Sequence, residues 1–309
     1  MTAAGLAAGA FLFGAPLRSG AASSEGPSAS ATPEALLERV NASRSDRGLP
    51  PLRLEPALAA LAAERAAASQ SGPLDFQDAA RRDRDAAEER GFEARSFAEL
   101  YVGSEGGAAT ILVNASRSAE FEEEIARAGN TSIGIGVARR GGMGLYVFLF
   151  ASSFSEHFAA STAPLGNLDR IRAEMLARVN GERAAAGRIP LRAQKLLDEA
   201  ALRHARDMLA RSYYGHASPD GRTPLDRARA AGYRTALVGE NIARGPYTVA
   251  EVMDAWMKSP DHRSHILSPE FRETGSAVAV GRNDAGYQVI WVQCFGKAQD
   301  AEPVRGRRR

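Results

Sequence analysis

The residues best suited to chemistry lie in one part of this 309-residue chain, where four of the five histidines fall between positions 204 and 265. His216 lies in a segment of turn residues. Glu240 lies in a short polar step between apolar residues, where a half-buried carboxylate needs a partner. His262 and His265 are three residues apart, so on a helical turn both rings share one face. Imidazole and carboxylate ligands suit a divalent metal such as zinc, which predicts a site of His216, Glu240 and His262, with His265 as a further candidate ligand.

A structural role for the same residues stays open, because hydrogen-bonded histidines can also tie a loop to the core. The chain has no HExxH or CxxC pattern. For His204, a solvent-facing or packing role and a role in the cleft are equally compatible with the sequence. Ser218 is near His216 in sequence, but a serine before proline in an Asp-Gly turn lacks the elbow that exposes a nucleophile. Cys294, the only cysteine, lies in an apolar run and is predicted to be a buried small hydrophobe.

These residues must be positioned by helices and by a closing strand. Apolar periodicity predicts helices at Gln194–Ser212 and Val249–Lys258. Ser259 and Pro260 then favour the start of a further helical turn that carries His262 and His265. An apolar strand is predicted at Val289–Phe295. Helices first and an antiparallel hairpin last indicate an α+β fold, in which the helices cover the faces of a sheet.

The chain repeats part of its own pattern. At a constant offset of 139, and without a gap, Val40-Asn41-x-x-Arg44-x-x-x-Gly48-x-x-Pro51-Leu52 matches Val179-Asn180-x-x-Arg183-x-x-x-Gly187-x-x-Pro190-Leu191. Gly91 followed eight residues later by Glu99 parallels Gly232 followed eight residues later by Glu240. A period of this length predicts a tandem duplication of whole domains rather than a solenoid of short units.

The pattern divides the chain into five parts. Residues 1–32 form a signal-like and flexible leader, 33–154 a first domain, 155–168 an open linker, 169–297 a second domain, and 298–309 a basic tail. In the leader, an apolar run followed by small residues has the pattern of a signal peptide, which predicts a secreted or periplasmic protein. No other apolar run is long enough to span a bilayer, so we expect no stable membrane span.

Composition narrows the range of partners. The formal net charge is +2, and the basic residues of the tail follow a nearly neutral body. A footprint on phosphates needs a stripe of cations on a folded face, so we expect no nucleic-acid partner. A single cysteine excludes an internal disulfide.

The ordered motifs of the second domain closely resemble the CAP superfamily. They are Gly215-His216-x-Ser218-Pro219-Asp220-Gly221, Gly232-Tyr233, Gly239-Glu240-Asn241-Ile242-Ala243, Trp256-Met257-x-Ser259-Pro260-x-His262-Arg263-x-x-Ile266-Leu267 and Gln293-x-Phe295-Gly296. This superfamily comprises cysteine-rich secretory proteins, insect venom antigens and plant pathogenesis-related proteins, and the match is to its bacterial, cysteine-free, SCP-like branch. The resemblance implies secretion and a three-layer α-β-α sandwich. It also implies a cleft of two histidines and two glutamates that binds a divalent metal in some members.

Only part of the family cleft carries over. The first family histidine corresponds to His216 and the first glutamate to Glu240. Ser259 stands where animal and plant members have the second glutamate, and Ile290 stands where they have a histidine on the last strand. His262 is the candidate to fill that space from another direction. The bacterial branch usually has asparagine at the position of His265, so a second ring there is a departure.

The first domain keeps the frame and Glu99 but has no histidine inside its fold. Asp75 or Gln77 falls near the position equivalent to His216. We therefore predict two tandem three-layer α-β-α (CAP-like) domains, of which the first is degenerate and binds no metal.

Three functions fit these features. The first is an exported binding module, whose cleft in the second domain holds a metal, a small apolar ligand or a macromolecular partner. No complete nucleophile set is present, so binding is favoured over catalysis. The second is a metal-dependent hydrolase in which His216 and His262 hold the metal and Glu240 is the base. The third is a scaffold for cell-envelope or protein partners, built from both domains.

Overall fold

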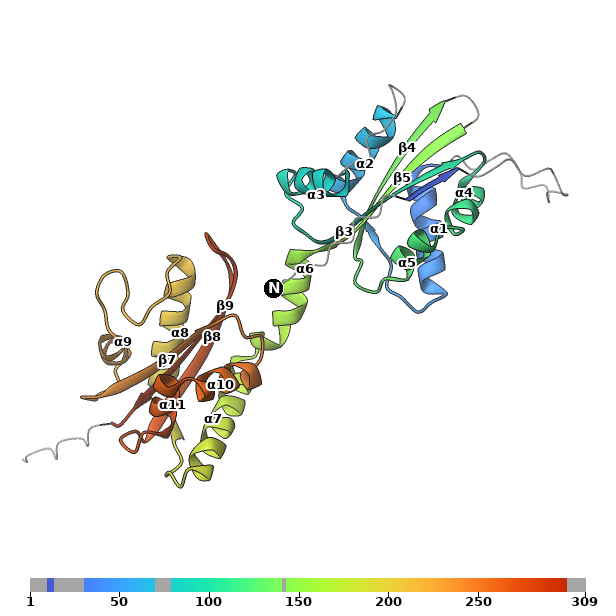
Figure 1. The fold of residues 1–309 in the computed structure, drawn as a ribbon. Helices are drawn as coiled ribbons and strands as arrows, with labels where there is room; N and C mark the ends of the chain where they lie inside the picture. Colours follow the sequence, from blue (N-terminus) through green and yellow to red (C-terminus); the bar gives the residue numbers. More distant parts are fainter. Residues whose placement is uncertain (1–9, 14–30, 70–78, 141–142, 299–309) are drawn as a thin grey trace, which may run out of the picture. The chain divides into compact units, whose positions relative to one another are not determined.

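The computed structural model describes residues 10–13, 31–69, 79–140 and 143–298. The chain divides into two compact units, Met1–His157 and Phe158–Arg309 (Figure 1). Asp75 and Gln77 lie outside the described residues, as do most of the predicted leader and all but the first residue of the predicted tail. No helix among the described residues is long and apolar enough to cross a membrane.

The first unit is a sheet with helices on both faces. Its helices are α1 (Pro33–Ser45), α2 (Pro56–Ala68), α3 (Ala79–Glu89), α4 (Ala108–Ala115) and α5 (Ala119–Ala126). Its strands are β1 (Ala10–Phe13), β2 (Arg53–Leu54), β3 (Ala94–Ser104), β4 (Ser132–Arg140) and β5 (Met143–Ser153). The strand order is β1-β3-β5-β4-β2. One apolar cluster joins α1, α4 and α5 to the sheet, and another joins α2 and α3 to it.

Strand β1 lies inside the segment predicted to be a signal-like and flexible leader. Ala10 pairs with Leu100 and Phe13 with Gly103, in a parallel ladder along β3. This strand falls in the apolar, signal-like run of the predicted leader, and the outer edge of β3 offers backbone groups that such an extended segment can pair with.

The second unit has the same kind of architecture. Its helices are α7 (Leu168–Ala185), α8 (Lys195–Ala210), α9 (Pro224–Ala230), α10 (Val249–Lys258) and α11 (Pro260–Leu267). Its strands are β6 (Arg192–Ala193), β7 (Val238–Arg244), β8 (Glu273–Asn283) and β9 (Gly286–Gly296), in the order β6-β8-β9-β7. One core lies against α7, α10 and α11, and the other lies against α8 and α9. The predicted α+β class and the three-layer arrangement are confirmed.

The segment predicted to be an open linker is helical. Helix α6 (Phe154–Thr162) contains the boundary between the units, and a 3₁₀ turn follows it at Ala163–Gly166. Phe158 and Leu165 are buried in the core of the second unit, which supplies the packing that the turn-prone composition did not reveal. Pro164 is compatible with this because it lies in the first turn of the 3₁₀ segment.

The repeated sequence motif folds in the same way in both units. The Asn180 side chain donates to the carbonyl of Leu191 and accepts from its N–H, at 3.0 and 2.7 Å. Asn41 makes the same two bonds with Leu52, at 3.0 and 2.8 Å. The motif arginines are fully buried, and each guanidinium donates to three or four backbone carbonyls: Arg183 to Ile189, Ile266 and Ser268, and Arg44 to Pro50, Ile125, Arg127 and Asn130.

The sheet register places the two equally spaced glutamates on equivalent rungs. In the first unit Leu149 pairs with Glu99 on one side and with Gly134 on the other. In the second unit the corresponding rung is Glu240, Cys294 and Gly275. Both glycines lie directly under a helix, and a Cβ atom on either would come within 2.4 Å of helix backbone. Each glutamate therefore has the same position relative to the second helix of its unit.

Candidate functional site

Three elements place His216 beside Glu240. Strand β7 carries Glu240 at its third paired position, α8 ends at Ala210, and the loop that follows holds His216. The loop then enters α9 through a capping box of Thr223 and Asp226, which fixes the start of that helix. The predicted loop position of His216 and the predicted helices are confirmed, with α8 at Lys195–Ala210 and α10 at Val249–Lys258.

The central contact is a hydrogen bond between His216 Nδ1 and Glu240 Oε1 at 2.9 Å. The Glu240 side chain is 1% exposed, whereas that of His216 is 52% exposed. A buried carboxylate therefore holds one edge of an imidazole whose other edge faces solvent. This fixes the ring orientation and favours the tautomer with the proton on Nδ1.

Arg227 organises this pair. One of its terminal nitrogens, Nη2, donates to Glu240 Oε2 at 2.8 Å and to the carbonyl of His216 at 2.8 Å. The other, Nη1, donates to Ser218 Oγ at 3.3 Å and to the carbonyl of Arg222 at 3.0 Å. Arg227 is 8% exposed, so the ion pair with Glu240 is buried. Sequence reasoning missed this residue, because Arg227 resembles the neighbouring surface arginines Arg222 and Arg229 in pattern.

His204 completes the buried side of the site. It is fully buried, and its Nε2 lies 3.1 Å from the carbonyl of Gly215 and 3.7 Å from Glu240 Oε1. Its Nδ1 lies 3.4 Å from the hydroxyl of Tyr213, which donates to Asp207 at 2.6 Å. Burial lowers the pKa of His204. The open alternatives for this residue are resolved: it packs, and it also contacts the cleft residues.

Asn241 holds the other two histidines. Its Oδ1 accepts from His265 Nδ1 at 2.9 Å, and its Nδ2 donates to the carbonyl of His262 at 3.1 Å. Both histidines lie on α11 (Pro260–Leu267), the helical turn that Ser259 and Pro260 predicted. Burial, followed by the charges of His216 and His265, lowers the pKa of His262.

The side chains do not fit the predicted metal role. Among the residues that the structure describes, no group of three or more histidine, cysteine or acidic side chains is arranged to hold a metal ion. Both oxygens of Glu240 are already engaged, one by His216 and the other by Arg227. A guanidinium next to a carboxylate also repels a second cation. The set of His216, Glu240 and His262, with or without His265, therefore lacks the free carboxylate that it needs.

Burial also argues against Ser218 and Cys294 as nucleophiles. Ser218 is 5% exposed and its hydroxyl accepts from Arg227, so it is not presented as a nucleophile. Cys294 is buried as predicted, with its sulfur 4.0 Å from Glu240 Oε2. Burial raises the pKa of this thiol well above its ordinary value, which disfavours the reactive thiolate.

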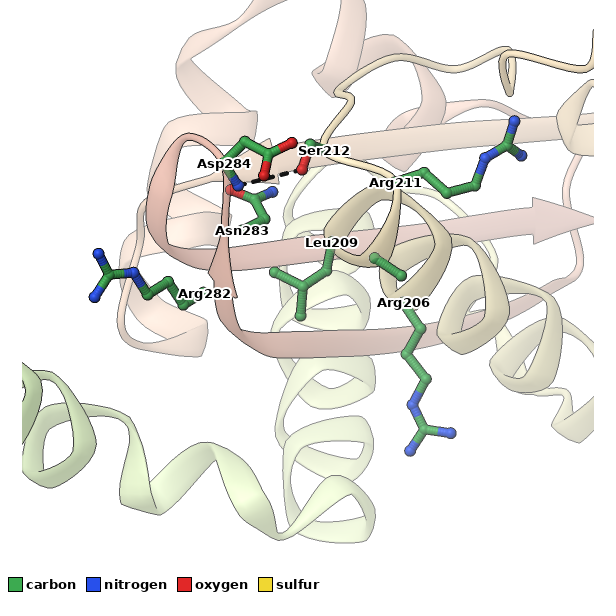
Figure 2. Close-up of a pocket in the computed structure, with 8 residues that line it drawn as sticks. Arg206, Leu209, Arg211, Ser212, Arg282, Asn283 and Asp284 are labelled. Carbon is green, nitrogen blue, oxygen red and sulfur yellow. Dashed lines mark hydrogen bonds between the residues drawn. The ribbon is translucent and has the colours of Figure 1, made fainter.

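A separate hollow of about 670 Å³ lies where the end of α8 meets the turn between β8 and β9. Figure 2 shows that the side chains of Arg206, Arg211 and Arg282 point away from one another around it. None of the four histidines of the second unit lines this hollow. Cations that diverge do not form an anion site, so we assign no ligand to it.

Acid is expected to destabilise the second unit. Burial lowers the pKa of His204, and burial with the charge of His216 lowers that of His265, from an ordinary value of 6.5. The unfolded chain then binds protons more readily than the folded one, so stability present above that value is lost as the pH falls through it. Urea unfolding followed by tryptophan fluorescence should show a lower midpoint at about pH 5 than at about pH 7.5.

Both tryptophans, Trp256 and Trp291, belong to the second unit, so this fluorescence reports that unit alone. His265→Asn should reduce the loss of stability in acid, whereas His157→Gln, at an exposed histidine of α6, should leave it unchanged. Equal unfolding midpoints at the two pH values in the unaltered chain would contradict the prediction.

The second unit is similar in sequence to known proteins. The model of the cysteine-rich secretory protein family (CAP) matches residues 176–295. The uncharacterized protein YkwD of Bacillus subtilis is 32% identical over 145 residues, which are 47% of this chain and 54% of that protein. The chain thus spans about half the length of this relative.

Two solved structures are also similar. An outer surface protein from Borrelia burgdorferi is 20% identical, with a TM-score of 0.37 over 41% of this chain and 92% of that one. An extracellular protein containing an SCP domain from Bacillus anthracis is 20% identical, with a TM-score of 0.35 over 50% of this chain and 53% of that one.

Proposed function

We propose that the second unit, in which residues 176–295 match the model of the cysteine-rich secretory protein (CAP) family, acts as a binding module whose ligand contacts His216. One observation carries the proposal: an exposed imidazole is held by a buried carboxylate, which is itself held by a buried guanidinium. These successive hydrogen bonds fix the orientation of the exposed imidazole. A histidine with a purely structural role does not need a fixed, exposed ring.

The chemistry of the ligand follows from the tautomer. With the proton on Nδ1 and bonded to Glu240, the Nε2 atom of His216 offers a lone pair to the solvent. The site therefore accepts a hydrogen bond from an N–H or O–H group. A ligand with such a donor gains a partner of fixed direction.

Binding is favoured over hydrolysis on the same grounds. Ser218 and Cys294 are buried, and neither has the exposure or the thiolate character of a nucleophile. The rival metal-dependent hydrolase needs Glu240 as a base, but Arg227 and His216 occupy both of its oxygens. We therefore derive no catalytic step for this site.

The proposal includes export and duplication. Residues 1–32 carry the apolar run and small residues of a signal peptide, which supports a location outside the cytoplasm. The matching strand order, the Asn41 and Asn180 side-chain bonds, and the equivalent rungs of Glu99 and Glu240 support two copies of one domain. The first copy has no histidine inside its described residues up to Glu156, so the proposed binding role belongs to the second.

Nuclear magnetic resonance of the imidazole nitrogens tests the role of His216. We expect its Nε2 to resonate as an unprotonated acceptor at neutral pH, and to shift when a ligand donates to it. Three probes distinguish the ligand classes: zinc ion, a long-chain fatty alcohol whose hydroxyl can donate to Nε2, and a soluble digest of peptidoglycan. His157, which is exposed on α6 in the first unit, is the internal control.

A saturable shift of His216 with one probe, absent from His157 and lost in His216→Gln, would support the binding role and identify the class. If zinc alone saturates His216 and His262 together, the metal-free interpretation is wrong. If the His216 ring carries its proton on Nε2, or if all three probes leave it unmoved, the proposed role fails.

A further inference from the structure

A second buried polar cluster lies in the first unit, at the position equivalent to the His216 site. Glu99 on β3 is 3% exposed and Asp83 on α3 is fully buried. Arg65 on α2 occupies the place that His204 has in the second unit, at the same offset of 139 as the repeated motif. Its Nε atom donates to both oxygens of Asp83, at 2.6 and 2.9 Å. The hydroxyl of Tyr101 donates to Glu99 Oε1.

The charges in this cluster do not balance. The charged and titratable groups that face Glu99 are Asp83 from α3, Arg65 from α2 and Tyr101 from its own strand. Two carboxylates therefore share one guanidinium. In the second unit, by contrast, the single carboxylate of Glu240 pairs with the single guanidinium of Arg227. An unpaired carboxylate is costly inside a protein, and the least costly remedy is to bind a proton.

The hydrogen bonds show which carboxyl carries that proton. Asp83 receives three hydrogen bonds from Arg65, two from Nε and one from Nη2, and such bonds favour an ionised carboxylate. Within the described part of the first unit, no ion pair joins a cation to Glu99, and Glu99 lies within hydrogen-bonding reach of the Asp83 carboxylate. We propose that Glu99 donates a shared proton to Asp83, and that losing this proton loosens the packing of α3 against β3, which makes the first unit a pH-sensitive element.

The sign of the effect follows from linkage. Burial, and then the hydrogen bond to Asp83, raises the pKa of Glu99 from 4.5 to about 8. The folded state holds this proton more tightly than the unfolded chain does, so its contribution to stability is complete in acid and is lost as the pH rises towards about 8. The second unit has the opposite dependence, because its buried histidines have lowered pKa values.

Hydrogen exchange in the full-length chain tests the proposal. After correction for intrinsic rates, peptides from β3 should lose about tenfold in protection between about pH 7 and about pH 9. Peptides from β9 in the second unit should lose less, about fourfold at most, because only the Cys294 thiol of the unfolded chain begins to ionise over this range. Glu99→Gln keeps the shape of the protonated side chain and should abolish the loss in β3.

Asp85→Asn is the matched control, because it removes an exposed carboxylate from the same helix and should leave the pH dependence intact. If Glu99→Gln does not fold, infrared spectroscopy of the unaltered chain still tests whether a carboxyl group is protonated. A protonated carboxyl has its own carbonyl band. We expect this band at neutral pH and its loss in alkali. Protection of β3 that is equal at both pH values, or the absence of the band, would overturn the proposal.

Discussion

Replacing Gly275 with alanine is expected to destabilise the second unit by about 3 kcal/mol or more, since overpacking against backbone has few routes of relief. A Cβ atom at this position would lie 2.2 Å from the backbone nitrogen of Asp198 and 2.4 Å from the carbonyl carbon of Leu197. Relief would require α8 to move away from the sheet. That movement would also displace His204 from Glu240.

Urea unfolding monitored by tryptophan fluorescence measures this loss. Gly181→Ala is the matched control, because Gly181 lies within α7 with no heavy atom near its added Cβ. That change should stabilise the unit by about 0.5–1 kcal/mol, as expected when alanine replaces an unstrained helical glycine. A Gly275→Ala chain as stable as the unaltered one would show that α8 does not contact the sheet as closely as the structure indicates.

Part of this arrangement could be predicted from the sequence. The equal spacing of Gly91 to Glu99 and of Gly232 to Glu240 in the sequence is matched by the sheet register, which places the two glutamates on equivalent rungs. Local signals were sufficient there, because a turn glycine and a strand of fixed length determine the rung. The start of α11 at Pro260 was predictable for the same reason.

The partners of Glu240 were less predictable. His216 was identified because its turn residues placed it on a loop, but Arg227 was not, since nothing local distinguishes an inward arginine from the outward Arg222. The helical segment between the units was also missed, because Phe158 and Leu165 are buried by residues far along the chain. Long-range packing determines such features, and single-sequence periodicity does not report it.

The ion pair between Arg227 and Glu240 distinguishes this cleft from the one that the family resemblance implied. The resemblance implied a cleft carboxylate available to a metal, whereas here Arg227 supplies the positive charge from within the protein. Glu240 then acts on His216 rather than on an ion. This difference predicts that the stability of the unit and the orientation of the exposed imidazole depend on the same pair.

Arg227→Met is therefore expected to be as damaging as Gly275→Ala. It leaves the carboxylate of Glu240, 1% exposed, without its cation, and it frees the carbonyl of His216. Breaking one partner of a buried ion pair costs about 3–5 kcal/mol, because an uncompensated charge stays buried. Urea unfolding by tryptophan fluorescence gives the free energy, and the imidazole nitrogen spectrum gives the tautomer of His216.

A double-mutant cycle measures the interaction energy between Arg227 and Glu240 separately from the effect of each single substitution. If the two charges stabilise each other, Arg227→Met combined with Glu240→Gln should cost less than the sum of the single changes. In Arg227→Met the His216 ring should keep its bond to Glu240, but in Glu240→Gln it should lose the preference for a proton on Nδ1. Additive free energies together with an unchanged tautomer in Glu240→Gln would mean that the carboxylate neither needs Arg227 nor orients the exposed ring.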